Sequence, residues 1–271
     1  MATRKSKKLD TFEGLYKRLE EVILANSGEN ELVVLKLWNE LNDEPVELTI
    51  DKANLKLRKI DLLWGGVLSE PRLLLCEEHY QICVSILKTF SLLKDGYEGV
   101  DGIFEFLISK EKKGSKGQYF TPRYIVDFCS KVINPKPGES ILDPAAGSGA
   151  FLYHAKQNCD GINANDLWGF DFDIVATRVA KLLMYVSKLE KSHIYRVNSL
   201  IKNNKVSDGE NITTIEDILR IEKQKELFDV IMTNPPFAGE ITESEILESY
   251  FVSTGKNRIE RDILFIERCI E

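Results

Sequence analysis

The chain has 271 residues, of which 43% are hydrophobic and 29% charged, enough for a substantial core and two domains. Its net charge of −7 argues against a protein that grips DNA through phosphate contacts alone. No apolar run is long enough to span a membrane, there is no signal peptide, and the five scattered cysteines match no metal-binding pattern, so we expect a cytoplasmic protein without membrane contact or metal site.

The first 110 residues are expected to form an all-helical domain. Apolar residues recur there at helical spacing, and Gly28 can end the first helix. The polar segment 110–117 (KEKKGSKG) is the best candidate for a linker, so a second domain is expected over residues 111–271. The first apolar stripe consists of Leu9, Phe12, Tyr16, Leu19 and Ile23.

The second domain alternates helices with short apolar strands. Thr121 is expected to cap a helix that begins with Pro122 and ends at Asn134–Pro135, with its apolar side chains on one face. Alternation of strands and helices predicts an α/β fold with a doubly wound, mostly parallel sheet. The expected strands are 140–142, 167–170, 193–197 and 228–233, and the helices between them begin near 149 and cover 173–188 and 214–225.

A glycine-containing turn follows the first strand of this domain, in the string DPAAGSGAF from Asp143 to Phe151. Gly147 and Gly149 allow unusual backbone angles, and the next helix begins with free N–H groups. Asp143 can accept from an ammonium group. An acid beside a helix N-terminus suits the methionine half of S-adenosyl-L-methionine better than a pyrophosphate, although an ordinary strand–turn–helix is the alternative.

The second and third strands also end in polar residues. Asp171 lies where an acidic residue commonly holds ribose hydroxyls, and Phe172 is placed to pack on an adenine face. The alternative makes Asp173 a helix cap and Phe172 a core residue. Asn198, after the third strand, is either a contact to the cofactor's adenine or a plain turn residue.

The fourth strand leads into Asn234–Pro235–Pro236–Phe237. The two prolines fix the backbone and remove two N–H donors, which leaves a rigid turn rich in acceptors. The Asn234 side-chain oxygen and the Pro235 carbonyl can then bind both hydrogens of one planar amino group. This binding frees the nitrogen lone pair for attack on a methyl group, without a strong base.

Phe237 supplies a flat face for stacking a base. A base within a duplex cannot reach such a site, so the target must flip out, at a cost of about a few kcal/mol. If the first and fourth strands are neighbours, the glycine turn and the NPPF turn face each other at the switch point of the sheet. The alternative is a rigid turn with Phe237 in the core.

The segment GQYFTP (117–122), then DPAAGSGAF, then NPPF resembles N6-adenine DNA methyltransferases, most of all the modification (M) subunit of type I restriction–modification systems. The resemblance covers residues 99–271 and implies the methyltransferase fold with S-adenosyl-L-methionine as cofactor. It implies that the segment with Tyr119, Phe120 and Thr121 closes over the cofactor's methionine end. It also assigns Asp143, Ala145, Gly147, Gly149 and Asp171 to the cofactor, and Asn234, Pro235, Pro236 and Phe237 to catalysis.

The same resemblance implies DNA, a specificity (S) subunit, a restriction (R) subunit and a second M subunit as partners. Many relatives have an acid where this chain has Asn198. The family's sheet continues beyond a helix like that expected over 261–271, so we expect a catalytic domain truncated at its C-terminus and inactive in isolation. The alternatives are a protein-glutamine N5-methyltransferase, which shares an NPP turn before an aromatic residue, and a non-catalytic assembly or DNA-binding module.

Overall fold

The computed structural model describes residues 11–23, 28–63, 68, 70–94, 99–103, 121–202, 213–224 and 227–271. The chain divides into two compact units, Met1–Lys113 and Gly114–Glu271. The boundary expected at residue 110 and the linker 110–117 lie outside the described residues. Among the residues described, no helix is both long and apolar enough to cross a membrane.

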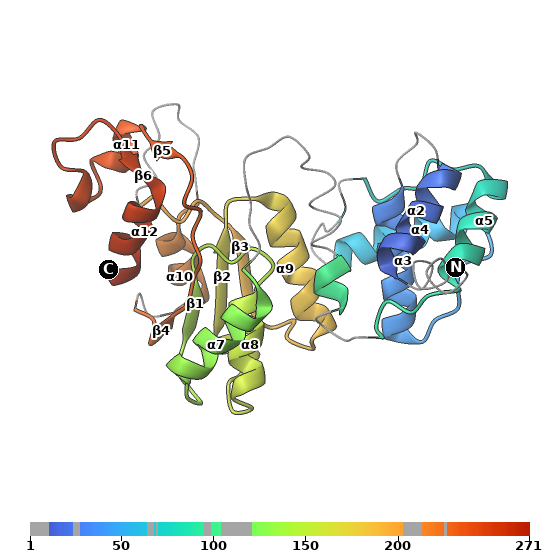
Figure 1. Ribbon diagram of the computed structural model, residues 1–271, viewed down its shortest axis with the longest axis horizontal. Coiled ribbons are helices and arrows are strands. Elements are labelled where there is room, and N and C mark those ends of the chain that lie inside the picture. The colour runs from blue at the N-terminus through green and yellow to red at the C-terminus, as the bar shows by residue number, and fades with distance from the viewer. Residues whose placement is uncertain are drawn as a thin grey trace, which may run out of the picture. The chain divides into compact units, whose positions relative to one another are not determined.

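The described part of the first unit is helical (Figure 1). The expected stripe is confirmed from Phe12 onward, because α2 buries Tyr16, Leu19 and Ile23, whereas Leu9 lies outside the described residues. Two further helices, α3 and α4, were not predicted individually. The helices are α2 (Phe12–Ile23), α3 (Glu29–Asn42), α4 (Ile50–Leu63) and α5 (Glu77–Leu87).

The second unit contains the expected parallel sheet, with strand order β3-β2-β1-β4. The first and fourth strands are parallel neighbours, as the switch-point expectation requires, with Leu142 opposite Ile231. The NPPF turn begins soon after this pair, because the amide of Met232 donates to the carbonyl of Leu142 at 3.0 Å. The strands are β1 (Ile141–Asp143), β2 (Leu167–Asp171), β3 (His193–Arg196) and β4 (Val230–Ile231).

Helices cover both faces of this sheet, so the unit is a three-layer α/β/α structure (Figure 1). On one face, Leu152 of α8 lies over Gly169 of β2, where a side chain would collide with it. On the other face, α10 packs against Trp168 and Phe170. The helices are α7 (Arg123–Ile133), α8 (Ala150–Asn158), α9 (Ile174–Val186) and α10 (Ile215–Glu222), with a 3₁₀ turn at Ala164–Asp166.

Helix α7 differs from expectation in its cap and in its buried face. Pro122 is the N-cap residue, with φ −54° and ψ 131°, and no side chain caps the helix. The sequence predicted one apolar face for this helix, made of Ile125, Val126, Cys129, Val132 and Ile133, and this face is largely exposed: the relative exposure of Ile125 is 39% and that of Val132 is 64%. Val126 alone of the predicted face is fully buried, because α7 packs through Val126 and Ser130 instead.

The last part of the chain forms a small subdomain with its own apolar cluster. The antiparallel strands β5 (Glu240–Ile241) and β6 (Ile259–Glu260) pair there. They are followed by the expected C-terminal helix, α12 (Arg261–Ile270), while α11 (Ser244–Leu247) and a 3₁₀ turn (Phe251–Ser253) lie between the strands. The cluster consists of Leu200, Ile241, Ile246, Leu247, Tyr250, Ile259, Leu264 and Phe265.

Candidate functional site

Asp143 ends β1 and is the most deeply buried acid of the site, with 1% of its surface exposed. Its Oδ1 accepts from the backbone amide of Ala145 at 3.1 Å. Burial is the main cause that raises the pKa of this carboxyl group from 3.8 to about 7; hydrogen bonding with Thr233 and the amide of Ala145 acts to lower it, and the nearby charge of Asp171 adds a smaller upward contribution. A cationic group placed beside Asp143 would offset this penalty and favour the charged form.

The two glycines of the turn after β1 have different structural roles. Both have positive φ angles, 55° at Gly147 and 80° at Gly149. A Cβ added at Gly147 would meet no atom within 4 Å, so this residue borders open space. A Cβ added at Gly149 would lie 2.9 Å from the Met184 side chain, so this residue allows α8 to pack against α9.

Asp171, the last residue of β2, braces the glycine turn. Its Oδ2 accepts from the amide of Gly147 at 2.9 Å, and its Oδ1 accepts from the amide of Asp173 at 2.8 Å. A carboxylate oxygen can accept more than one hydrogen bond. Asp173 caps α9 through bonds from the amides of Val175 and Ala176, as the second interpretation of this segment expected.

The Phe172 side chain is on the surface rather than in the core, with 67% of its area exposed. The guanidinium carbon of Arg196 lies 5.9 Å from the centre of its ring. Arg196 also donates through Nε to the carbonyl of Phe172 at 3.2 Å. The ring is therefore held near the end of β2 with much of its surface open to a planar partner.

Asn198 is a turn residue, which was the simpler of its two interpretations. Its Oδ1 accepts from the amide of Leu200 at 3.1 Å. The next residue, Ser199, donates through its hydroxyl to the carbonyl of Pro144 at 2.6 Å. Ala145 packs against the apolar cluster of the C-terminal subdomain. The turn after β1 is thus supported from the end of β3 and from the C-terminal subdomain.

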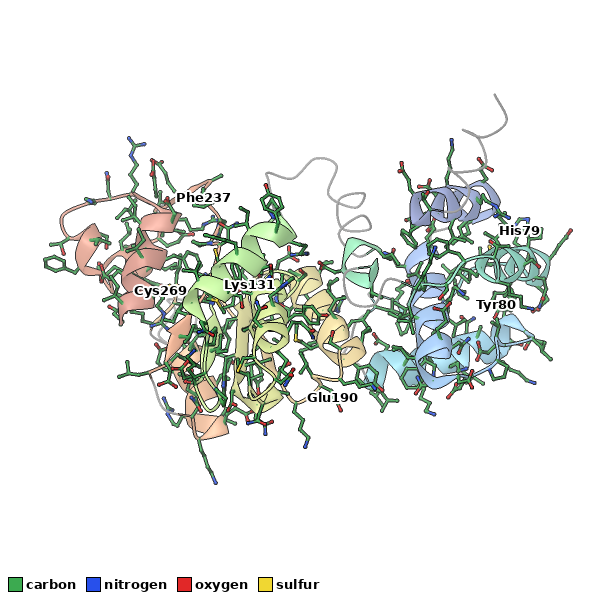
Figure 2. The ribbon with its side chains drawn as sticks, turned by 60° about the horizontal axis from the view of Figure 1, so that its bottom comes forward. His79, Tyr80, Lys131, Glu190, Phe237 and Cys269 are labelled. Carbon is green, nitrogen blue, oxygen red and sulfur yellow. The ribbon has the colours of Figure 1, made fainter. Side chains whose placement is uncertain are left out.

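The NPPF turn follows β4 and is joined to residue 121 by one side-chain bond. The Nδ2 of Asn234 donates to the Thr121 hydroxyl at 2.8 Å, across a sequence separation of 113 residues. Asn234 and Pro235 are half-buried, whereas Pro236 is exposed. Phe237 is 68% exposed and lies beside the C-terminal elements in Figure 2, so the interpretation of Phe237 as a core residue is wrong.

Two arginines, Arg123 and Arg268, hold the site together and were not predicted as part of it. Arg123 donates to the carbonyl of Thr121 at 3.4 Å and to the Ser148 hydroxyl at 3.2 Å. Arg268 of α12 donates through Nε to the carbonyl of Ser199 at 2.8 Å and pairs with Glu216 at 2.6 Å. Apart from the bond to Thr121, these contacts join distant segments, so no local sequence pattern could have identified them.

The residues at the carboxyl ends of these strands suit a ligand with a cationic group and hydroxyls. The buried Asp143 carboxyl matches a cation, the Asp171 carboxylate can accept from hydroxyls, and Gly147 borders open space. Tyr119 and Phe120 lie outside the described residues. Within the described ranges, no group of three or more His, Cys, Asp or Glu residues is placed to hold a metal ion.

Residues 97–271 match a protein family described as N-6 DNA Methylase. The methylase subunit of the type I restriction enzyme EcoEI from Escherichia coli is 29% identical over 178 residues, covering 62% of this chain and 32% of that subunit. The MjaIX methylase subunit of Methanocaldococcus jannaschii is 32% identical over 143 residues, covering 50% and 22%. The chain spans about a third of the length of the first of these relatives.

Two solved structures share the fold of this chain. A modification subunit of a putative type I restriction enzyme from Vibrio vulnificus YJ016 has a TM-score of 0.66 at 18% identity, covering 98% of this chain and 67% of that one. A type I restriction-modification methyltransferase subunit from Streptococcus thermophilus has a TM-score of 0.55 at 15% identity, covering 98% and 58%. At these identities the likeness shows the methyltransferase fold alone.

Proposed function

The chain belongs to the N-6 DNA methylase family, and on that premise we propose that it is part of a modification subunit that methylates the exocyclic nitrogen of adenine in DNA. The fold and family are those of S-adenosyl-L-methionine-dependent methyltransferases. We assign the catalytic domain to residues 111–271 and the helical domain to residues 1–110. The proposed location is the cytoplasm, where the DNA lies.

The cofactor would supply an electrophilic methyl group carried on a sulfonium. We propose that Asp143 binds its ammonium group, because the buried carboxyl has a pKa raised to about 7 and gains most from a cation. Asp171 would accept from ribose hydroxyls while it holds the amide of Gly147. Phe172 would stack on the adenine of the cofactor, and Asn198 would shape the adjoining turn.

The remaining proposed cofactor residues line the turn after β1 and the segment before α7. Ala145 and Gly149 keep the backbone of the turn in place, since one packs on the C-terminal cluster and the other on Met184. We propose that Thr121 lies near the methionine end, with Tyr119 and Phe120 preceding it. These roles come from the family resemblance and remain proposals.

The proposed catalytic step depends on two acceptors and no strong base. The Oδ1 of Asn234 and the carbonyl of Pro235 would each accept one hydrogen of the target amino group. This geometry draws the nitrogen toward a tetrahedral arrangement and exposes its lone pair for in-line attack. Pro235 and Pro236 keep the turn rigid, because neither can rotate freely about φ.

Phe237 is suited to receive a base that has left the duplex. With 68% of its area exposed at the edge of the unit, its ring offers a face for stacking. Stacking and the two acceptor bonds would offset part of the cost of flipping, about a few kcal/mol.

The pairing of β1 with β4 is the observation that carries this proposal. It places the turn after Asp143 and the turn before Phe237 on adjacent parallel strands, about 4.8 Å apart, at the carboxyl edge of the sheet. Ligands of open α/β sheets bind at this edge, so a methyl donor at one turn would lie beside an acceptor at the other.

The proposed partners are DNA, a specificity subunit, a restriction subunit and a second modification subunit. A net charge of −7 is consistent with sequence reading by another subunit, because counterion release at phosphates requires basic surface. Arg123 is one basic residue that the structure directs inward, toward Thr121 and Ser148.

The test is transfer of labelled methyl groups to DNA by the protein assembled with its specificity subunit. Asn234→Ala is expected to lower the turnover number at least 100-fold, because one of two acceptors is lost. Asn165→Ala, at an exposed position in the 3₁₀ turn that precedes β2 at the amino edge of the sheet, is the matched control and should leave turnover unchanged. Transfer to a release-factor glutamine but not to DNA would replace this proposal with protein-glutamine methylation.

A further inference from the structure

The side-chain amide of Asn234 has one acceptor and one donor end, and only one of them is useful in the proposed reaction. The oxygen can accept a hydrogen bond from a target amino group. The nitrogen is itself a donor, so it would face another donor and form no hydrogen bond. A half-turn about the last side-chain bond exchanges the two ends. Some contact must therefore select the orientation that presents the oxygen.

Thr121 makes a contact of this kind. Its hydroxyl accepts from the Nδ2 of Asn234 at 2.8 Å, and both residues are half-buried. The bond occupies the donor end of the amide, which leaves Oδ1 for another donor. Thr121 is not the cap of α7, so its side chain is not committed to the helix.

The position of Thr121 is itself held by the turn after β1. Arg123 donates to the carbonyl of Thr121 and to the hydroxyl of Ser148, which lies between the two glycines of that turn. Residues 121–123 therefore connect the NPPF turn with the glycine turn through hydrogen bonds. A shift of one turn would be transmitted to the other through Arg123 and Thr121.

We propose that Thr121 is a positioning residue that orients the Asn234 amide with its oxygen toward the target amino group, and that Arg123 links this orientation to the glycine turn. The proposal rests on the proposed function for its effect on methylation. The orientation of the amide itself does not depend on that function. It assigns the Thr121 hydroxyl to Asn234; a hydroxyl that instead contacted the methionine end of the cofactor would make Thr121→Val lose cofactor affinity.

The kinetic test compares Thr121→Val, which removes the hydroxyl at nearly constant shape, with Thr121→Ser, which retains it. In the assembled enzyme, Thr121→Val should lower kcat about 10-fold while the cofactor Kd and the KM for DNA change less than about 2-fold. Thr121→Ser should stay within about 3-fold of the parent. The double variant with Asn234→Ala should be no slower than Asn234→Ala alone, because Thr121 acts through Asn234.

Three kinetic results would overturn the proposal: full activity of Thr121→Val, a cofactor Kd that weakens in step with kcat, or additive losses in the double variant. A second measurement uses the 271-residue chain and requires no activity. The side-chain amide signal of Asn234, assigned by its absence in Asn234→Ala, should shift in NMR spectra of Thr121→Val and not of Thr121→Ser. If the unaltered enzyme methylates no DNA, the proposed function fails, and this spectrum still decides the orientation.

Discussion

Replacement of Asp143 with asparagine is expected to stabilise the cofactor-free chain at high pH. The carboxyl group is 1% exposed, and burial raises its pKa from 3.8 to about 7. A raised pKa means that the folded state holds the proton more tightly than the unfolded state does. The protonated carboxyl group therefore makes its full contribution to the free energy of unfolding below about pH 4, and this contribution is lost as the pH rises through 7.

The size of the effect follows from these two values. Each unit of pKa difference corresponds to roughly 1.4 kcal/mol, so the charged carboxylate costs the folded state about 4 kcal/mol at pH 8. The same relation gives roughly 2 kcal/mol at pH 5. Asparagine carries no charge and can keep the bond from the amide of Ala145. The advantage of Asp143→Asn should therefore grow by about 2–3 kcal/mol between pH 5 and pH 8.

The assay is urea-induced unfolding of the cofactor-free chain and its variants at several pH values. Asp160→Asn, at an exposed turn after α8, is the control and should follow the parent at every pH. Asp171 and Cys269 also face the Asp143 carboxyl electrostatically, so both should be left unchanged in these variants. A constant difference between Asp143→Asn and the parent across this range would refute the reasoning.

A second measurement on the same pair of proteins addresses the proposed cofactor contact. A bound ammonium group favours the charged carboxylate, so binding near pH 6.5 should release a proton from Asp143. Titration calorimetry in two buffers of different ionisation enthalpy detects this release, which should vanish in Asp143→Asn together with most of the affinity. Equal proton release by both proteins would place the ammonium group elsewhere.

Three other substitutions separate binding from packing in the same unit. Gly149→Ala should lower the free energy of unfolding by about 2 kcal/mol, because its Cβ would lie 2.9 Å from Met184 and φ is 80°; urea unfolding measures this. Gly147→Ala should lower the free energy of unfolding by only about 1 kcal/mol, because of the φ of 55°. It should nevertheless weaken cofactor binding at least 10-fold, because the added methyl group enters the open space beside the turn. Calorimetry measures both quantities, and an unchanged cofactor affinity would contradict the prediction. Arg268→Met should destabilise the chain by about 2 kcal/mol, since the half-buried Glu216 loses its partner, and a double-mutant cycle with Glu216→Gln should show coupling between the two side chains.

The sequence predicted the parts of the fold that depend on local patterns. Apolar strands ending in polar residues identified β1 to β3, and the turn with Gly147 and Gly149 was expected where the backbone requires positive φ. The fourth strand was expected over 228–233, but regular pairing covers only Val230–Ile231. The apolar stretch is longer than the pairing because the partner strand β1 has only three residues, although the amides of Asp229 and Met232 still donate to the carbonyls of Ser140 and Leu142.

Contacts between distant segments could not be predicted in this way. The expected cap at Thr121 followed a local rule, but its hydroxyl bonds with Asn234, 113 residues away. The sequence predicted an apolar face on α7, yet Ile125 and Val132 on this face are exposed. Periodicity shows that a helix face is apolar, but it does not show which other segment covers that face. The bond from Arg268 to Ser199 depends on how α12 folds back, which no motif records.

The glycine turn and the NPPF turn both lie at the carboxyl edge of the sheet, so its amino edge is free for a probe. The turn between α9 and β3 carries the exposed residue Glu190, labelled in Figure 2, and it precedes the start of the strand at His193. In a chain whose accessible native cysteines have been replaced, the exposed Cys76 first, a cysteine introduced there would carry a fluorophore at the opposite end of β3 from Asn198. Such a label would report on tumbling and assembly by anisotropy without entering either turn.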